Sequence, residues 1–204
     1  RKNGSLRIIG HRQEKNHRLV TVVGTGGVGK TRLALQAAQD QLYAFSDGAF
    51  WIQLENIDRP EALPAIIAST LGIELSVRGE PQTHILNFLR HRDILLIFDN
   101  FDRLVSGAGF ITNLLNHAPG LSILATSREP LQLQAEWILE LEGLPIQSEA
   151  GFNTPAAILL FEQRAQSIFP EFQLSPKDYG DALRLCESLD GLPLGIELAA
   201  VLTK

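Results

Sequence analysis

Short apolar runs alternate with helical patterns over the first 145 residues of the chain. The runs at 49–54 and 94–98 are almost unbroken in apolar and aromatic residues, which is typical of strands buried on both faces of a parallel sheet. The segments between the runs repeat apolar residues at helical spacing. We therefore predict a three-layer α/β/α fold around a parallel sheet, with strands at 19–23, 49–54, 94–98, 121–126 and 137–141.

The pattern changes to helices alone after residue 145. Thr154 and Pro155 predict the start of one helix, and the capping sequence at 175–178 predicts a second. Gly191 suits a left-handed cap, and Pro193 suits the first turn of a third helix. We therefore expect a leader at 1–18, a sheet domain at 19–145 and a small C-terminal helical lobe at 146–204.

The composition suits one sizeable core and a smaller satellite, since 45% of the 204 residues are hydrophobic. Cys186 is the single cysteine, and it falls in an apolar helical stripe, so we expect it to pack rather than to act as a nucleophile or ligand. No segment has the length of a membrane span or the layout of a secretory signal, which predicts a cytoplasmic chain without a membrane partner. The sequence starts at Arg1, lacks methionine and ends in an apolar run, so we expect a piece of a larger protein.

Basic residues gather at the start of the chain, although the net charge is −5. Residues 1–18 contain six basic residues and one acid. A basic arm can bind nucleic acid through its phosphates, so a DNA-binding module is one functional class to test. The arm has no aromatic residue for base stacking, and the acidic remainder would repel phosphates. A solvated leader is therefore favoured, and we do not expect this fragment to bind nucleic acid directly.

The chemistry that dominates the sequence lies in one loop, which reads Gly24-Thr25-Gly26-Gly27-Val28-Gly29-Lys30-Thr31. It follows a β-branched run and precedes a helical pattern, so its backbone N–H groups can turn toward an anion at a helix N-terminus. The G-x-x-x-x-G-K-T spacing predicts that Lys30 reaches the β- and γ-phosphates of a nucleotide and that Thr31 is a Mg²⁺ ligand. We include the next residue, Arg32, in the nucleotide-binding set. A glycine turn before a helix would explain the glycines, but not Lys30 and Thr31.

Asp99 ends one of the predicted buried strands, at the sheet edge where open α/β folds bind ligands. A carboxylate there can hold Mg²⁺ opposite Thr31, so we predict Asp99 as the second metal ligand. Asn100 follows at a position where an acid often activates the attacking water, and an amide can orient water but cannot take its proton. Asp102 is the nearest candidate base; its alternative role is the N-cap or first-turn charge of a helix at 103–117. We therefore expect slow hydrolysis.

Arg128 follows the strand predicted at 121–126, on the same edge of the sheet as Lys30 and Asp99. Its planar guanidinium could bind the γ-phosphate. The alternative is an ion pair with Glu129 or with another neighbour. The candidate catalytic residues are thus Lys30, Asp99, Asp102 and Arg128.

Four segments in this order carry a family resemblance: 24–31, 95–100, 125–128 and 191–194. Together they resemble the NB-ARC (AP-ATPase) branch of the STAND ATPases, in the form found in large bacterial transcriptional regulators with tetratricopeptide-type repeats. The resemblance covers residues 8–204. It implies a P-loop NTPase fold with the sheet order 5-1-4-3-2, and it implies that ATP or ADP binds with Mg²⁺.

The resemblance also implies roles for individual residues. Lys30 and Thr31 would bind phosphates and Mg²⁺, Asp99 would be the metal-binding acid, Arg128 would sense the γ-phosphate, and Pro193 would pack against the adenine. Further domains of the same chain are implied, a winged helix and a repeat sensor, with self-association in the ATP state. Family members usually open with an hhGR-type segment; here His11 stands where the arginine is expected.

These features predict an ATP/ADP-binding, Mg²⁺-dependent molecular switch, a module of a larger signalling or transcription-regulating ATPase that hydrolyses ATP weakly to ADP and phosphate. The alternative is a P-loop kinase that transfers a phosphoryl group to a small acceptor. Such a kinase needs an acceptor pocket and usually a mobile lid that carries arginine. The region after residue 143 is rich in packing residues and offers only Arg164 and Arg184.

Overall fold

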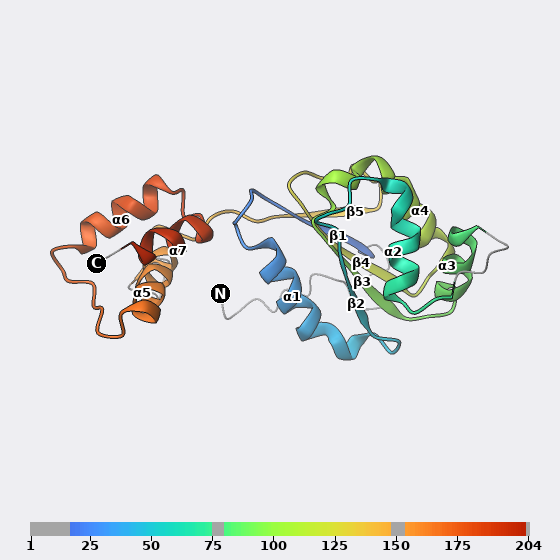
Figure 1. The fold of residues 1–204 in the computed structure, drawn as a ribbon, viewed down its shortest axis with the longest axis horizontal. Helices are drawn as coiled ribbons and strands as arrows, with labels where there is room; N and C mark the ends of the chain where they lie inside the picture. Colours follow the sequence, from blue (N-terminus) through green and yellow to red (C-terminus); the bar gives the residue numbers. More distant parts are fainter. Residues whose placement is uncertain (1–16, 75–79, 148–153, 203–204) are drawn as a thin grey trace. The chain divides into compact units, whose positions relative to one another are not determined.

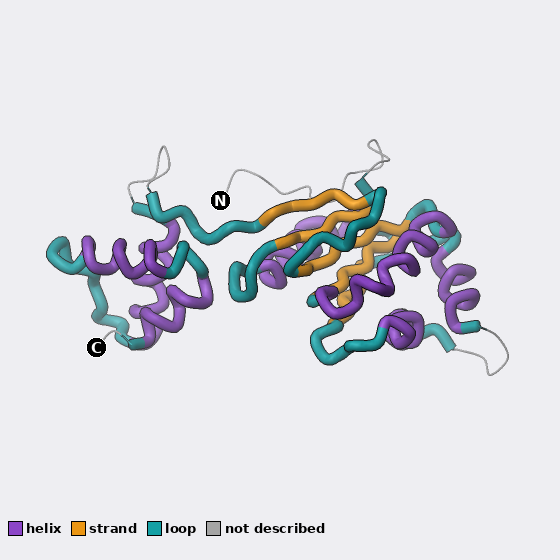
Figure 2. The backbone as a smooth tube through the Cα atoms, turned by 90° about the horizontal axis from the view of Figure 1, so that it is seen from above, coloured by secondary structure: helices purple, strands orange, loops and turns teal. Residues whose placement is uncertain are grey.

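Contacts divide the chain into two units, which Figures 1 and 2 show as ribbon and tube. The computed structural model describes residues 17–74, 80–147 and 154–202. The first unit contains Arg1–Gly24 and Lys30–Glu140, and the second contains Thr25–Gly29 and Leu141–Lys204. Most of the predicted leader, and the hhGR-type segment with it, lies outside the described residues.

The elements follow the order that the apolar pattern predicts. Two predicted helices are divided, because each begins with a 3-10 segment before the α-helix starts. In chain order the elements are β1 (Leu19–Val23), α1 (Lys30–Gln41), η1 (Leu42–Ala44), β2 (Ala49–Gln53), η2 (Pro60–Ala62), α2 (Leu63–Thr70), α3 (Pro81–Leu89), β3 (Ile94–Asp99), η3 (Phe101–Gly107), α4 (Ala108–His117), β4 (Leu121–Ser127), β5 (Glu136–Glu140), α5 (Ala156–Ile168), α6 (Tyr179–Ser188) and α7 (Pro193–Val201).

The sheet has five strands in the order β2-β3-β4-β1-β5, and every neighbouring pair is parallel. This confirms the predicted order 5-1-4-3-2, read from the opposite edge. Val23 of β1 pairs with Ser127 of β4, and Phe98 of β3 pairs with Ala125 of β4. The carboxyl ends of β1, β3 and β4 therefore lie side by side on one edge, where a ligand site of an open α/β sheet is expected.

Helices cover both faces of the sheet, which confirms the three-layer fold. Ile94, Leu96 and Phe98 of β3 belong to the main core cluster, together with residues of α2, α3 and α4. Leu95 and Ile97 are equally buried but lie outside that cluster, because successive side chains of a strand point to opposite faces. Helix α1 contacts β1, β3 and β4, and it lies across the sheet from α2 and α4 (Figure 1).

The second unit is helical beyond residue 145, and α5, α6 and α7 share a core of their own. Cys186 is fully buried in this core, as expected of a packing residue. Within this unit the Leu194 N–H donates to the Gly27 carbonyl at 3.2 Å, and a Cβ added at Gly27 would approach Leu194 Cβ to 2.7 Å. None of the helices in the described ranges has the length and apolar character needed to cross a membrane.

Candidate functional site

The loop between β1 and α1 has the backbone of an anion cradle. Gly27 and Gly29 have φ values of +79° and +102°, which side chains other than hydrogen disfavour. A Cβ added at Gly26 or Gly29 would meet no atom within 4 Å, so open space borders the loop at both positions. Helix α1 begins directly after the loop, at Lys30. Its N-terminal N–H groups and the loop amides are suited to bind a phosphate.

Lys30 is a buried cation that bonds to the start of its own loop. Its side chain is 8% exposed, and its Nζ donates to the Gly24 carbonyl at 2.8 Å. Burial lowers the pKa of Lys30 below its ordinary 10.5, while Asp102 raises it, Arg128 lowers it and Asp99 raises it. A cation that has lost much of its hydration gains when an anion replaces the water, so Lys30 is suited to contact phosphate.

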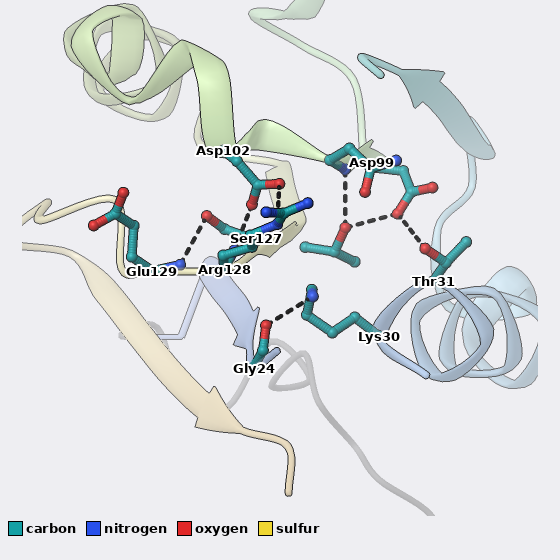
Figure 3. Close-up of polar contacts among 10 residues, drawn as sticks. Gly24, Lys30, Thr31, Asp99, Asp102, Ser127, Arg128 and Glu129 are labelled. Carbon is teal, nitrogen blue, oxygen red and sulfur yellow. Dashed lines mark hydrogen bonds and ion pairs between the residues drawn. The ribbon is translucent and has the colours of Figure 1, made fainter. Parts of the chain in front are cut away.

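Thr31 and Asp99 meet at the edge of the sheet, as Figure 3 shows. The Thr31 hydroxyl donates to Asp99 Oδ1 at 2.9 Å, and the Asp99 side chain is almost fully buried. These two oxygen-bearing side chains come from α1 and β3, which are 68 residues apart in sequence at this contact. Hydroxyl and carboxylate oxygens are the ligand types that Mg²⁺ prefers.

Thr126 is a site residue that sequence reasoning did not single out. Its hydroxyl donates to Asp99 Oδ1 at 2.6 Å and accepts the N–H of Asn100 at 3.0 Å. Thr126 is fully buried, and its hydrogen bond to Asp99 lies away from solvent. The contact depends on the parallel register of β3 and β4, in which Phe98 pairs with Ala125 and the next residues, Asp99 and Thr126, follow together. The segment 125–128 is one of the four segments of the family resemblance, but only the sheet register shows that Thr126 is the side chain that reaches Asp99.

Asn100 adopts the left-handed conformation, with φ 63° and ψ 56°. Asparagine tolerates this region better than most residues, because its short polar side chain can bond locally. The backbone therefore gives a reason for an amide at this position, in addition to the orientation of water that the sequence predicts. The hydrogen bond from the Asn100 N–H to Thr126 holds this conformation beside Asp99.

Asp102 and Arg128 bond to each other. The Arg128 N–H donates to Asp102 Oδ1, and Arg128 Nε lies 3.6 Å from Asp102 Oδ2 (Figure 3). Of the two alternatives for Arg128, the structure shows an ion pair, with Asp102 and not Glu129 as its partner. Asp102 lies in the first turn of η3, where Asn100 holds the N-cap position. Its carboxylate thus binds across to the end of β4 and does not cap its own helix.

The remaining predicted site residues are distributed as follows. Arg32 is exposed in the first turn of α1, and Val28 is buried within the loop, where its N–H donates to the Thr25 carbonyl at 3.4 Å. Pro193 begins α7 in the second unit, and its contact with adenine stays a prediction. The first unit brings together Lys30, Thr31, Asp99, Asp102 and Arg128.

The residues at the edge of the sheet suit Mg²⁺ bound together with a nucleotide. Across the described ranges, no group of three or more His, Cys, Asp and Glu side chains is placed to hold a metal ion. Mg²⁺ in nucleotide sites is characteristically held by one or two protein oxygens, with phosphates and water as the other ligands. Thr31 and Asp99 supply that kind of partial set next to the phosphate loop.

Comparison with protein families decides the affiliation. The NACHT domain family matches residues 18–152, which is more than half of the chain. The chain belongs to the NACHT domain family. This family is a class of STAND P-loop ATPases, so the prediction of a nucleotide-binding STAND ATPase fold is confirmed at that level. The match begins just before β1 and includes the phosphate loop and all five strands of the sheet.

Mycobacterial proteins are among the relatives of this NACHT domain. A protein of Mycobacterium tuberculosis, described as a proposed HTH-type transcriptional regulator, is 34% identical over 185 residues, which cover 90% of this chain and 20% of the relative. A second M. tuberculosis protein, described as uncharacterized, is 29% identical over 187 residues, or 91% of this chain and 46% of the relative. The chain thus spans about a fifth of the first relative and under half of the second.

Solved structures share the fold of this NACHT domain at low sequence identity. The ORC2 protein of Aeropyrum pernix has a TM-score of 0.60 and 12% identity, over 93% of this chain and 56% of that one. The Cdc6p protein of Pyrobaculum aerophilum has a TM-score of 0.59 and 15% identity, over 96% and 58%. A Pyrococcus horikoshii STAND protein with a tetratricopeptide repeat sensor has a TM-score of 0.56 and 18% identity, over 100% and 30%. At these identities the likeness shows the fold alone.

Proposed function

We propose that this NACHT domain is the nucleotide switch of a larger regulatory protein, which binds ATP or ADP with Mg²⁺ and hydrolyses ATP slowly. The observation that carries the proposal is the 2.9 Å hydrogen bond between Thr31 and Asp99 at the end of a complete phosphate loop. ATP and ADP would favour different conformations of the domain, and hydrolysis would return it from the ATP state to the ADP state. The segments 95–100, 125–128 and 191–194 of this NACHT domain resemble those of the NB-ARC branch of the STAND class, and we propose that they act as the corresponding NB-ARC segments do.

The residues of the site divide the work. Backbone amides of the loop 24–31 and the Lys30 ammonium would bind the phosphates, with Arg32 and Pro193 completing the nucleotide-binding set. Thr31 and Asp99 would hold Mg²⁺, which neutralises charge on the phosphates when it is bound. The Asn100 amide can orient the attacking water, and Asp102 is the nearest candidate for the base. We expect slow hydrolysis, because Asn100, the residue next to Asp99, cannot take a proton from the water.

The role in a larger regulator rests on the relatives. The chain matches about a fifth of a mycobacterial protein described as a proposed HTH-type transcriptional regulator. We therefore propose that further domains of the same polypeptide, a winged helix and a repeat sensor, read the nucleotide state, with self-association when ATP is bound. We propose a cytoplasmic location for such a regulator.

Turnover of ATP labelled in the γ-phosphate tests the proposal against a kinase function. We expect slow release of free phosphate with an equal amount of ADP, and no stimulation by small hydroxyl or amine acceptors. Label on an acceptor would support the P-loop kinase instead. Limited proteolysis should also give different fragment patterns with ADP and with a non-hydrolysable ATP analogue. Identical patterns, with equal affinities for both nucleotides, would contradict the switch.

A further inference from the structure

Asp102 contacts both the backbone and the side chain of Arg128. Its Oδ1 accepts the Arg128 N–H, and its Oδ2 lies 3.6 Å from Arg128 Nε. The two parts of the arginine differ in freedom, because its backbone directly follows β4 and donates its N–H to Asp102, whereas its side chain is 73% exposed. The Asp102 side chain is only 24% exposed. The guanidinium can therefore leave while the carboxylate and the backbone contact stay in place.

The Asp102 carboxylate lies beside the Arg128 guanidinium, a cation that the proposed function directs toward phosphate. An anion in this position stabilises the cation, as a phosphate oxygen would.

The neighbouring acids are engaged elsewhere or more exposed. Glu129 is exposed, and its N–H donates to Ser127 Oγ at 3.3 Å. Asp99 accepts the hydroxyls of Thr31 and Thr126. Asp102 is therefore the acid that the described structure pairs with the arginine.

We propose that Asp102 is a specificity-determining positioning residue: it holds Arg128 as an internal counter-ion, and the arginine exchanges this carboxylate for the γ-phosphate when ATP binds. The inference rests on the proposed function of this site. ATP has to displace the ion pair to gain the contact with Arg128, whereas ADP leaves the pair intact. Asp102 thereby lowers the preference for ATP over ADP. The hydrogen bond from the Arg128 N–H to Asp102 keeps the arginine in place with either nucleotide.

Calorimetry of the Asp102→Asn variant tests the exchange, with Mg²⁺, ADP and a non-hydrolysable ATP analogue. The amide can still accept the Arg128 N–H, but it no longer holds the guanidinium by charge. An exposed ion pair is worth a few tenths to 1 kcal/mol, so the ratio of analogue to ADP affinity should rise about two- to fivefold. An unchanged ratio would overturn the inference, whether or not the variant hydrolyses ATP more slowly.

Arg128→Ala completes a double-mutant cycle. If Asp102 acts through the arginine, adding Asp102→Asn to Arg128→Ala leaves the ratio of the two affinities where Arg128→Ala alone puts it. A further change in the double variant would show that Asp102 acts by another route and would overturn the exchange. The unfolding midpoint of each variant is recorded first, so that affinities are compared only between folded proteins.

The chain offers a matched control in Asp47. Its carboxylate binds the Arg92 guanidinium at 3.1 Å and accepts the Asp93 N–H at 2.8 Å, a similar pair of contacts that lies before β2 and β3 and not after them. Asp47→Asn should leave the affinity ratio unchanged; an equal shift in both variants would count against a specific role of Asp102. If wild-type chain binds neither nucleotide, the proposed function itself fails. If it binds both and Asp102→Asn leaves their ratio unchanged, only the exchange fails.

Discussion

The hydroxyl of Thr126 lies 2.6 Å from Asp99 Oδ1 and also accepts the N–H of Asn100. One buried side chain thus orients the predicted metal-binding carboxylate and holds the strained residue that follows it. Partners of this kind, which contact a ligand residue and not the metal, fix the direction of the ligand. Thr126 is therefore expected to influence Mg²⁺ binding without contacting the ion.

Thr126→Val should weaken the effect of Mg²⁺ on nucleotide affinity. Loss of a partner of a metal ligand typically costs about 10- to 100-fold in metal affinity, because the ligand is no longer oriented. The unpaired Asn100 N–H should also lower the free energy of unfolding by about 1–3 kcal/mol. Titration of Mg²⁺ into the complex with the ATP analogue measures the first effect. Thr126→Ser keeps the hydroxyl and serves as control; a valine variant with wild-type Mg²⁺ dependence would refute the role.

Thr21→Val should stabilise the chain. Thr21 is fully buried in β1, and its hydroxyl is the buried side-chain oxygen that lacks a hydrogen-bond partner in the described residues. Removing a desolvated and unpaired hydroxyl should raise the free energy of unfolding by about 1 kcal/mol. Urea unfolding measures the change, and nucleotide affinity should not move. A loss of stability similar to that of Thr126→Val would show that the Thr21 hydroxyl is paired.

Asn100 should tolerate glycine better than alanine. Its φ of 63° places it in the left-handed region, which costs a residue with a Cβ about 1–2 kcal/mol unless its side chain can bond locally. We expect Asn100→Ala to unfold at a lower urea concentration than Asn100→Gly, by about 1 kcal/mol in free energy. If both variants unfold together, the left-handed conformation does not explain the asparagine.

The stability of the nucleotide-free chain should depend on pH through Lys30. Burial lowers its folded-state pKa below the ordinary 10.5, so between these two values the unfolded chain holds a proton that the folded chain has lost. The free energy of unfolding contributed by this group therefore rises with pH across that window and levels off above 10.5. Lys30→Met removes the group, and the other titrations cancel in the difference. The wild-type chain should gain stability relative to Lys30→Met as the pH rises; a flat or falling difference would contradict the prediction.

Much of the fold follows from local patterns. Each strand predicted from an apolar run is present within one residue at either end. The inner strands β1, β3 and β4 are buried along their whole length and so must be apolar, whereas the edge strands β2 and β5 are only partly buried. Phosphate binding by the loop 24–31 could be predicted for a different reason, since the lysine and threonine next to its last glycine have no role in a plain turn. The metal-binding role of Asp99 could be predicted from its place at the end of β3.

The contacts between strands could not be predicted in the same way. The bond from Thr126 to Asp99 requires the register of β3 against β4, which no pattern within either strand specifies. The pairing of Asp102 with Arg128 joins residues 26 positions apart. The pairing also depends on η3, a 3-10 helix that precedes α4, whereas the sequence predicts one regular helix at 103–117. The sequence left Arg128 with several possible partners, and the structure selects Asp102.

Calorimetry on the wild-type chain and on Lys30→Ala tests the central claim most directly, that the loop 24–31 binds the phosphates of an adenine nucleotide. ADP and a non-hydrolysable ATP analogue are titrated with Mg²⁺, and folding is checked by urea unfolding. We expect the wild-type chain to bind both nucleotides and Lys30→Ala to lose most of the affinity, with the larger loss for the triphosphate. Wild-type chain that binds neither nucleotide, or a folded Lys30→Ala variant that binds both unchanged, would contradict the account.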